Sequence, residues 1–315
     1  LLNLAFLTWI SWRVMRFRPD ELQRYYWPAL VFKVVAGLSL GGIYFYYYGA
    51  GDTIAYWSDG KAISMLMRTD PMQALAFFWD EQATPDFTTS LVQLAPRSLF
   101  FSKICGVIAL ISGDNYWVMA TWLSLFSFFA SWMLVVTIGS IVREAVPSAV
   151  LAFLFLPSAV FWSSGLIKES LGLAALYILV ALGISAIHVH RLRMHEWLLA
   201  TVSIWVGWNL KYYWMGVFLP VALAVIATSG ITRWKSSLAR WDVGISLLLL
   251  VIFLAIGTHV HPNFYTSRFL EVIAQNYLEF ARLSEPPRIV QYVNLEPTLS
   301  SVLFNAPAAL VAGLF

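Results

Sequence analysis

The chain has 315 residues, of which 60% are hydrophobic and only 12% charged, and its mean hydropathy is +0.72. A soluble domain carries about 25% charged residues, because water must hydrate its surface. This composition therefore excludes a soluble enzyme, a nucleic-acid-binding protein and a disordered chain, and it indicates a protein whose solvent is lipid. The net charge of +3 says little until it is divided between the two sides of a membrane.

Apolar segments long enough to cross a bilayer recur along the whole chain. A spanning helix needs about 20 apolar residues, and shorter or kinked helices are tolerated inside a bundle. The expected spans are roughly 1–12, 28–48, 116–141, 147–163, 170–188, 196–209, 213–229, 242–259 and 300–315. The sequence thus predicts an all-α, polytopic membrane protein, with about eight or nine transmembrane helices. We expect residues 1–315 to form a single transmembrane domain and, since both ends lie in apolar runs, to be a fragment of a longer chain.

The distribution of charge sets the expected topology. The apolar stretch 99–113 is short and contains Lys103, so we expect it to be re-entrant or to lie on the membrane surface. One face then receives 11 basic and five acidic residues and the other 9 basic and 12 acidic residues, or charges of +6 and −3. By the positive-inside rule the first face is cytoplasmic. The outer face has two long loops, 49–115 and 260–299, the first of which we expect to contain amphipathic helices lying on the membrane.

The first outer loop opens with Gly51-Asp52-Thr53, directly after an aromatic helix end. A carboxylate at the point where a spanning helix meets water can act as a general base close to a lipid-borne substrate. The alternative is that Asp52 caps a helix that starts at Thr53, as aspartate commonly does. Tyr56 follows on the same segment and is a candidate substrate-binding residue. Most of the other charged residues of this loop, a group that includes Asp59, are expected to form a solvated face.

A polar turn at residues 163–165 joins two apolar segments on the outer face, and Lys168-Glu169 begins the second of them. A lysine at a helix start opposes the helix dipole and calls for a compensating anion. Backbone N–H groups at such a terminus also bind phosphate. Lys168 is therefore a candidate phosphate ligand and Glu169 a candidate catalytic carboxylate. The alternative is a Lys168–Glu169 charge pair that only anchors the turn.

A second outer turn, 208–214, places Lys211 and Tyr212 among aromatic rings. This combination suits a phosphate or the face of a sugar, and the alternative is a lysine that snorkels within an aromatic belt. In the second long loop, Arg282 and Arg288 are candidate diphosphate ligands, because guanidinium groups bind phosphate oxygens in pairs, and Arg268 is a further candidate substrate-binding residue. Ordinary charge pairing on a helix face is the alternative for each of them.

Metal and nucleotide chemistry have little support in the sequence. The single cysteine, Cys105, excludes a disulfide framework and a multi-cysteine metal site. The two His-X-His pairs fall on opposite faces, and two ligands are too few for a metal site. No glycine-rich phosphate-binding motif of the Walker or Rossmann type occurs, nor the serine elbow of hydrolases. We therefore expect no bound metal.

An outward aspartate just after an N-terminal spanning helix, followed by a long loop of membrane-lying helices, resembles the type C (GT-C) glycosyltransferase superfamily of integral membrane enzymes. The residues that carry the resemblance are Gly51-Asp52-Thr53 with Tyr56, and the turn from Pro157 to Glu169. The segment from Leu295 to Pro307 also resembles membrane proteins of bacterial polysaccharide clusters. The resemblance in layout covers most of the chain, although its motifs are short.

The resemblance implies a multi-pass protein of the bacterial inner (cytoplasmic) membrane with its active face outward. The donor would be a sugar on a polyprenyl phosphate, and no other cofactor is implied. Asp52 would correspond to the catalytic aspartate of the first loop, and Lys168, Lys211 and Arg288 would hold the lipid phosphate. Thr53 stands where the family has a second acidic residue, so the mechanism needs one carboxylate or a distant partner such as Glu169.

Two further functions remain open at this point. A polysaccharide polymerase or ligase would transfer a whole lipid-linked glycan, but it would be expected to show arginine-rich basic pairs in its outer loops. A non-catalytic subunit would use its aromatic loops to pack against membrane-protein partners. In each case membrane lipids surround the chain, and no nucleic acid is expected as a partner.

Overall fold

A computed structural model describes residues 2–16, 20–188, 192–260, 264–283 and 289–314 of the chain. Throughout these ranges the regular secondary structure is helical, without a strand, which confirms the expected all-α class. The helices form two compact units, Leu1–Met215 and Gly216–Phe315.

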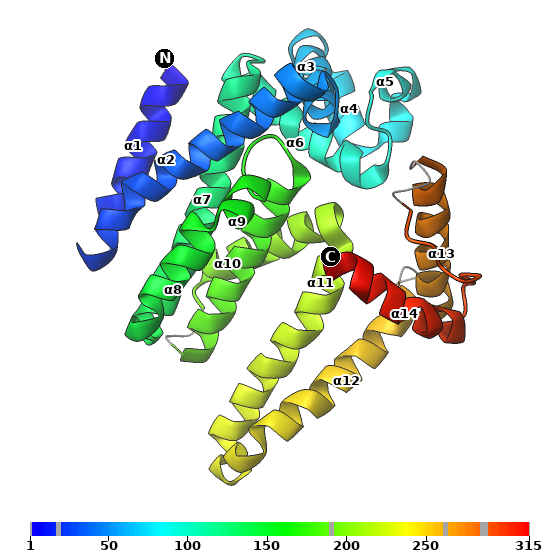
Figure 1. Cartoon of the computed structure of the whole chain (residues 1–315). Coiled ribbons are helices and arrows are strands. Elements are labelled where there is room, and N and C mark those ends of the chain that lie inside the picture. The colour runs from blue at the N-terminus through cyan, green and yellow to red at the C-terminus, as the bar shows by residue number, and fades with distance from the viewer. Residues whose placement is uncertain (1, 17–19, 189–191, 261–263, 284–288, 315) are drawn as a thin grey trace. The chain divides into compact units, whose positions relative to one another are not determined.

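Three long helices form the centre of the first unit. They are α2 (Asp20–Ile43), α7 (Tyr116–Ile141) and α10 (Lys168–His188), and α7 packs against both of the others (Figure 1). α2 continues through a π-helical turn, η1 (Tyr44–Tyr48), and α1 (Leu2–Arg16) lies against α7. α7 and α10 each have long apolar sequences with small residues on their buried faces, which let membrane helices approach closely.

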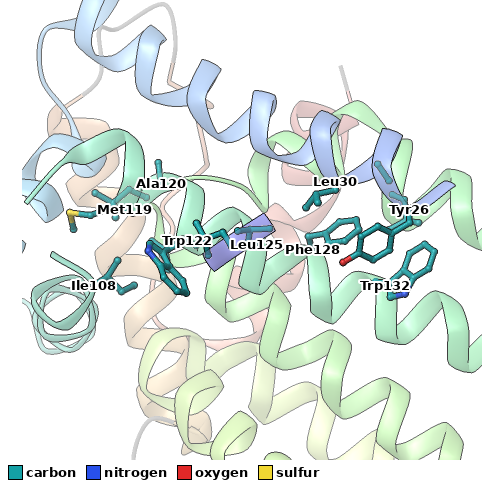
Figure 2. Packing of buried hydrophobic residues seen from close by; sticks show 14 of the residues in the cluster. Tyr26, Leu30, Ile108, Met119, Ala120, Trp122, Leu125, Phe128 and Trp132 are labelled. Atoms are coloured by element: carbon teal, nitrogen blue, oxygen red, sulfur yellow. The ribbon is translucent and has the colours of Figure 1, made fainter. Parts of the chain in front are cut away.

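The core of this unit is aromatic. Tyr26 of α2 is fully buried and meets Phe128 and Trp132 of α7 edge to face, with ring centroids 5.1 and 4.8 Å apart (Figure 2). Ile108 and Met119 belong to the same cluster of buried residues. Edge-to-face aromatic pairs contribute about 0.5–1.5 kcal/mol beyond the burial of their area. Lipid tails are as apolar as these side chains, so the hydrophobic effect does not drive the helices together within a bilayer. Close packing of this kind therefore holds them together.

Between η1 and α7 the chain folds into four helices: α3 (Asp52–Thr69), α4 (Pro71–Trp79), α5 (Pro85–Ser90) and α6 (Pro96–Ser112). α3 and α6 pack against each other where two glycines face the opposite helix. A Cβ atom on Gly60 would lie 3.2 Å from the backbone of Cys105, and one on Gly106 would lie 2.4 Å from a methyl carbon of Ile63. Glycine at both positions therefore permits the close crossing.

Burial on α3 and α6 differs from the expectation of solvated charges. Asp59 is 2% exposed, on the face of α3 that packs against α6, so its expected place on a solvated face is wrong. Lys103 of α6 is also buried, and its Nζ lies 2.7 Å from an oxygen of Glu81. A charged side chain can be buried where a partner of opposite charge or hydrogen bonds compensate it. Such a partner can come from a distant part of the chain, so the apolar periodicity of one helix does not predict this burial.

The expected span 147–163 is not one continuous helix. α8 (Val146–Val150), a π-helical turn η4 (Leu151–Phe155) and α9 (Pro157–Trp162) follow one another. The break falls at Leu156, which is extended because the ring of the following Pro157 disfavours helical backbone before it.

Residues 163–167, between α9 and α10, form a buried segment of irregular backbone. Gly165 has φ +76°, and a Cβ atom there would lie 2.9 Å from the carbonyl oxygen of Gly37 in α2. Its N–H donates to Ser124 Oγ of α7 over 3.0 Å. Buried irregular backbone is stable where its polar groups find hydrogen-bond partners, as the N–H of Gly165 does here.

The long helix α11 (Met194–Trp234) is interrupted at Lys211, whose φ of −144° and ψ of 61° are not helical. Two helices therefore meet at a kink in this position, and they correspond to the expected spans 196–209 and 213–229. The first of them, up to Met215, belongs to the first unit.

The second unit contains the rest of α11, a 3-10 turn η5 (Ser236–Trp241), α12 (Asp242–Val260), α13 (Thr266–Leu283) and α14 (Leu299–Leu314). Segment 236–259 has a mean hydropathy of 2.2 over its most apolar stretch, and none of that stretch is buried within the protein. Apolar helices that protein does not cover require an apolar solvent, which is the bilayer. α13 instead carries charged residues along one face.

Five helical segments in the described ranges are long and apolar enough to cross a membrane: 22–48, 116–141, 168–188, 194–234 and 236–259. The chain is thus a multi-pass membrane protein. α6, at 17 residues, and the apolar part of α14 are shorter than these five.

Candidate functional site

Charged side chains from four separate segments of the first unit gather around Lys168. They come from the first turns of α3, α6 and α10 and from the kink in α11. The carboxylates of Asp52 and Glu169 and the cations of Arg97 and Lys211 all interact electrostatically with the Lys168 ammonium. We call these five residues the charged cluster. It contains Asp52, Lys168, Glu169 and Lys211, which the sequence had selected, and Arg97, which it had not.

Lys168 is the first residue of α10, as the sequence predicts. Its ammonium donates to Ser98 Oγ over 3.1 Å and lies 5.5 Å from the ring centroid of Tyr56. The Tyr56 hydroxyl also donates to Ser98 Oγ, over 3.2 Å. Burial raises the pKa of Tyr56, which outweighs the lowering effect of its hydrogen bond to Ser98, so the phenol stays protonated and acts as a donor.

Glu169 pairs with Lys211 and not with Lys168. Lys211 Nζ donates to Glu169 Oε1, and it lies 5.4 Å from the ring centroid of Trp214. The alternative of a local Lys168–Glu169 pair is therefore not the ion pair formed. Gly172, one turn further along α10, leaves the space that Trp214 and the Lys211 side chain occupy, since a Cβ atom there would lie 3.2 and 3.3 Å from them.

Asp52 is exposed in the first turn of α3. The residue at the N-cap is Gly51, with φ +139°, and no side chain caps this helix, so the alternative that Asp52 caps a helix starting at Thr53 is wrong. A carboxylate in the first turn is favoured by the helix dipole. The side-chain amide of Gln93 approaches Asp52 Oδ1 to 3.4 Å.

The segment that carries Gln93 is held by the buried carboxylate of Asp59. This carboxylate accepts hydrogen bonds from the backbone N–H groups of Val92 and Gln93, over 2.8 and 3.0 Å, and from Ser102 Oγ over 2.9 Å. Three hydrogen bonds compensate the desolvation of the charge. Asp59 thus ties the start of α6 to α3 and places Gln93 beside Asp52.

Arg97 lies in the first turn of α6, and its guanidinium carbon is 5.2 Å from the ring centroid of Tyr212. This contact ties Tyr212, which the sequence had selected, to the charged cluster. Pro96 at the first helical position is a recognised start signal, and it could have placed Arg97 and Ser98 at a helix N-terminus from sequence alone. No feature of the sequence predicts the contact between Arg97 and Tyr212.

Of the three arginines expected from the second outer loop, Arg268 and Arg282 belong to α13 of the second unit, and the third is not among the described residues. Arg268, in α13 of the second unit, pairs with Glu271 one turn along the same helix at 3.2 Å, which is the helix-face alternative. Arg288 lies outside the described residues. No group of three or more metal-ligating side chains occurs in the part of the chain that the structure describes.

The charged cluster suits an anion next to a carboxylate. Lys211 is matched by Glu169, which leaves the positive charges of Lys168 and Arg97 against the single negative charge of Asp52. The N-termini of α3, α6 and α10 add partial positive charge and backbone N–H groups at the same place. Comparison with protein-family models, with curated proteins and with solved structures found no match to this chain.

Proposed function

We propose that this protein is a membrane glycosyltransferase that moves a sugar from a polyprenyl-phosphate donor to an acceptor hydroxyl at the outer face of the membrane. The observation that carries the proposal is the charged cluster, in which the exposed carboxylate of Asp52 and the cation of Arg97 both interact electrostatically with Lys168, from the first turns of α3, α6 and α10. A lipid-borne phosphate and a proton acceptor are the two groups that such a transfer requires.

Asp52 acts as the general base in this proposal. It is exposed, so an acceptor hydroxyl can reach it, and its contact with Gln93 orients the carboxylate. Taking the hydroxyl proton as the acceptor oxygen attacks the anomeric carbon strengthens the nucleophile, and the bond to the phosphate oxygen breaks at the same centre.

Lys168 and Arg97 bind the donor phosphate and stabilise the charge that grows on it as it leaves. Both groups are fixed by neighbouring residues, Lys168 by Ser98 and Arg97 by the ring of Tyr212. Preorganised cations of this kind stabilise a leaving-group anion at little cost in reorganisation. Glu169 serves to hold Lys211 at the kink and is a positioning residue in this scheme.

The proposed membrane arrangement has eight or nine crossing segments, with both long loops on the outer side of a bacterial inner membrane. The five long apolar helices, the broken segment 146–162 and the shorter apolar helices at both ends support it. The excess of basic residues in the short connections places these connections on the cytoplasmic side, by the positive-inside rule.

The test is transfer of labelled sugar from polyprenyl-phosphate-linked donors in membranes that contain each variant. Asp52→Asn keeps the shape of the side chain but cannot take a proton, so we expect transfer to fall by about 10²- to 10⁴-fold with donor binding unchanged. Lys168→Ala is expected to weaken donor binding as well as slow transfer. Asp86→Asn is the matched control, because Asp86 is also exposed in the first turn of a helix in the same loop.

Full transfer by Asp52→Asn would remove Asp52 from the mechanism. Absence of transfer by the unaltered protein with every donor would favour a non-catalytic membrane subunit instead. Transfer of preassembled glycans only, with single-sugar donors inactive, would favour a polymerase or ligase.

A further inference from the structure

A recess in the first unit is lined by aromatic rings, among them Trp57, five residues along α3 from Asp52. It has a volume of about 410 Å³, and its lining includes Tyr46 of η1, Trp57 of α3, Trp117 of α7, and Asp114 and Asn115 from the turn between α6 and α7. We call it the aromatic pocket. Small-molecule sites span about 300–1,000 Å³, so the recess is large enough for a ligand of that class.

Ring packing and a hydrogen bond hold the walls of the aromatic pocket in place. The ring of Phe45 packs edge to face on Trp57 and Tyr116, with centroids 5.6 and 4.8 Å apart. The indole N–H of Trp57 donates to the carbonyl oxygen of Asp114 over 2.8 Å. Trp117 is 37% exposed and Tyr46 is 85% exposed, so ring surface remains open above these buried contacts.

Polar groups are built into the same turn. Asp114 has φ +61°, a left-handed conformation that is uncommon outside glycine, and its carboxylate forms a two-pronged contact with Arg68 at 2.6 and 3.4 Å. Burial raises the pKa of Asp114, but the hydrogen bond and charge of Arg68 outweigh this effect and hold the pKa below its ordinary value. Asn115 accepts hydrogen bonds from the N–H groups of Trp117 and Val118 through its side-chain oxygen, which directs its NH₂ group away from the helix.

Open aromatic faces beside a carboxylate and an amide are the chemistry that binds a saccharide. The rings cover the apolar C–H faces of a sugar, while the carboxylate and the amide accept from and donate to its hydroxyl groups. A quaternary ammonium ligand fits less well, because two cations already lie here: Lys61 Nζ is 3.7 Å from the ring centroid of Trp57, and Arg68 pairs with Asp114. An aromatic belt alone would not bring rings from three segments together around a carboxylate and an amide.

The pocket is connected to the charged cluster through α3. Thr53, next to Asp52, hydrogen-bonds Tyr116, a pocket residue, with 2.7 Å between the two hydroxyl oxygens. Five residues of helix from Asp52 to Trp57 correspond to about 7.5 Å along the axis. We propose that the aromatic pocket is a saccharide-binding subsite that holds the acceptor glycan, so that one hydroxyl reaches Asp52 while Lys168 and Arg97 hold the donor. Its assignment to the acceptor rests on the proposed function, but saccharide binding does not.

The test is saturation-transfer NMR on the full chain in lipid nanodiscs, free of sugar-based detergent, with methyl glycosides of hexoses, deoxyhexoses and N-acetylhexosamines as probes. We expect at least one glycoside to receive saturation from the unaltered protein. Trp117→Ala is expected to weaken its binding roughly tenfold. Asn115→Asp keeps the cap of α7 but loses the NH₂ donor, and it should also weaken binding. Trp79→Ala is the control, since Trp79 is 92% exposed and lies in α4, outside the pocket.

The outcomes separate this inference from the proposed function. No binding of any glycoside, or binding by Trp117→Ala and Asn115→Asp equal to that of Trp79→Ala, overturns the subsite. Asp52→Asn should bind glycosides normally while losing transfer. Binding that depends on the pocket, in a protein that transfers nothing, would leave the subsite standing and remove the glycosyltransferase. Transfer by Trp117→Ala with an unaltered KM for the acceptor would leave the glycosyltransferase standing and remove the assignment of the pocket to the acceptor.

Discussion

Lys33, in the middle of α2, donates a hydrogen bond from its side-chain nitrogen to the hydroxyl of Ser163, the C-cap residue of α9. The two residues are 130 positions apart in the chain, and Lys33 is only 3% exposed. Ser163 Oγ in turn donates to the carbonyl oxygen of Ala159 in the last turn of α9. A lysine side chain thus lies at the negative end of a helix dipole, inside a segment long and apolar enough to cross the membrane.

The first prediction concerns this pair. Ser163→Ala removes the acceptor and leaves the buried ammonium short of a hydrogen bond, so we expect a loss of about 1–3 kcal/mol in the free energy of unfolding. Lys33→Met combined with Ser163→Ala replaces both groups by apolar ones and should recover most of that loss. Thermal unfolding of the two single variants and the double variant in nanodiscs measures the coupling. Additive effects, with no recovery in the double variant, would show that the two residues do not interact energetically.

The second prediction concerns Asp59. In Asp59→Asn one of the two acceptor oxygens becomes an NH₂ group that faces a backbone N–H donor, so one hydrogen bond to segment 92–93 is lost. We expect the protein to remain folded but to lose about 1–3 kcal/mol locally. Trypsin cleavage after the exposed Arg97 should then become faster. Asp86→Asn serves as the control, and an unchanged cleavage rate would contradict a role for Asp59 in holding this segment.

The third prediction concerns the crossing of α3 and α6. Gly106→Leu forces a side chain into a space where even a Cβ atom would meet Ile63 at 2.4 Å. Overpacking of a well-packed contact costs about 1–3 kcal/mol, and here it should lower the thermal unfolding temperature. Gly42→Leu is the matched control, since nothing lies within 4 Å of a Cβ atom at Gly42. If the two substitutions lowered the unfolding temperature equally, the close approach of α3 and α6 at Gly106 would not be needed for stability.

The fourth prediction uses Cys105, the single thiol of the chain, which is fully buried in α6. Burial raises the pKa of the thiol well above its ordinary value, and the nearby Asp59 carboxylate raises it further. Since the thiolate is the reactive form, maleimide labelling at pH 8 should be slow in the folded protein and fast after unfolding.

The sign of the pH effect on Cys105 follows from the same shift. A thiol that resists ionisation when folded contributes stability below the pKa of the unfolded chain, ordinarily 9.0, and that contribution is lost as the pH rises above it. The difference in unfolding temperature between the unaltered protein and Cys105→Ala should therefore narrow above pH 9.0. Rapid labelling of the folded protein at pH 8 would contradict the burial of Cys105.

Composition and local signals predicted a large part of the architecture. With 12% charged residues the chain has too few polar side chains to cover a soluble surface, so an all-α membrane protein followed from composition. The polar residues that interrupt apolar runs marked helix ends in advance, because a charge is costly within a bilayer and is tolerated where a helix begins or bends. Lys168 at the start of α10 and Lys211 at the kink of α11 are examples.

Only the tertiary structure decided which charged groups meet. Glu169 was a candidate catalytic carboxylate, with a local pair with Lys168 as the alternative, yet it pairs with Lys211, 42 residues further on, while Lys168 binds Ser98. Asp59 was expected in solvent, and the charge balance counted Lys33 with the cytoplasmic connections, yet both are buried. Helical periodicity reports which residues share one face of a helix. The facing helix is chosen by packing between segments far apart in sequence, and that packing determines whether a charge is paired, buried or free to bind a substrate.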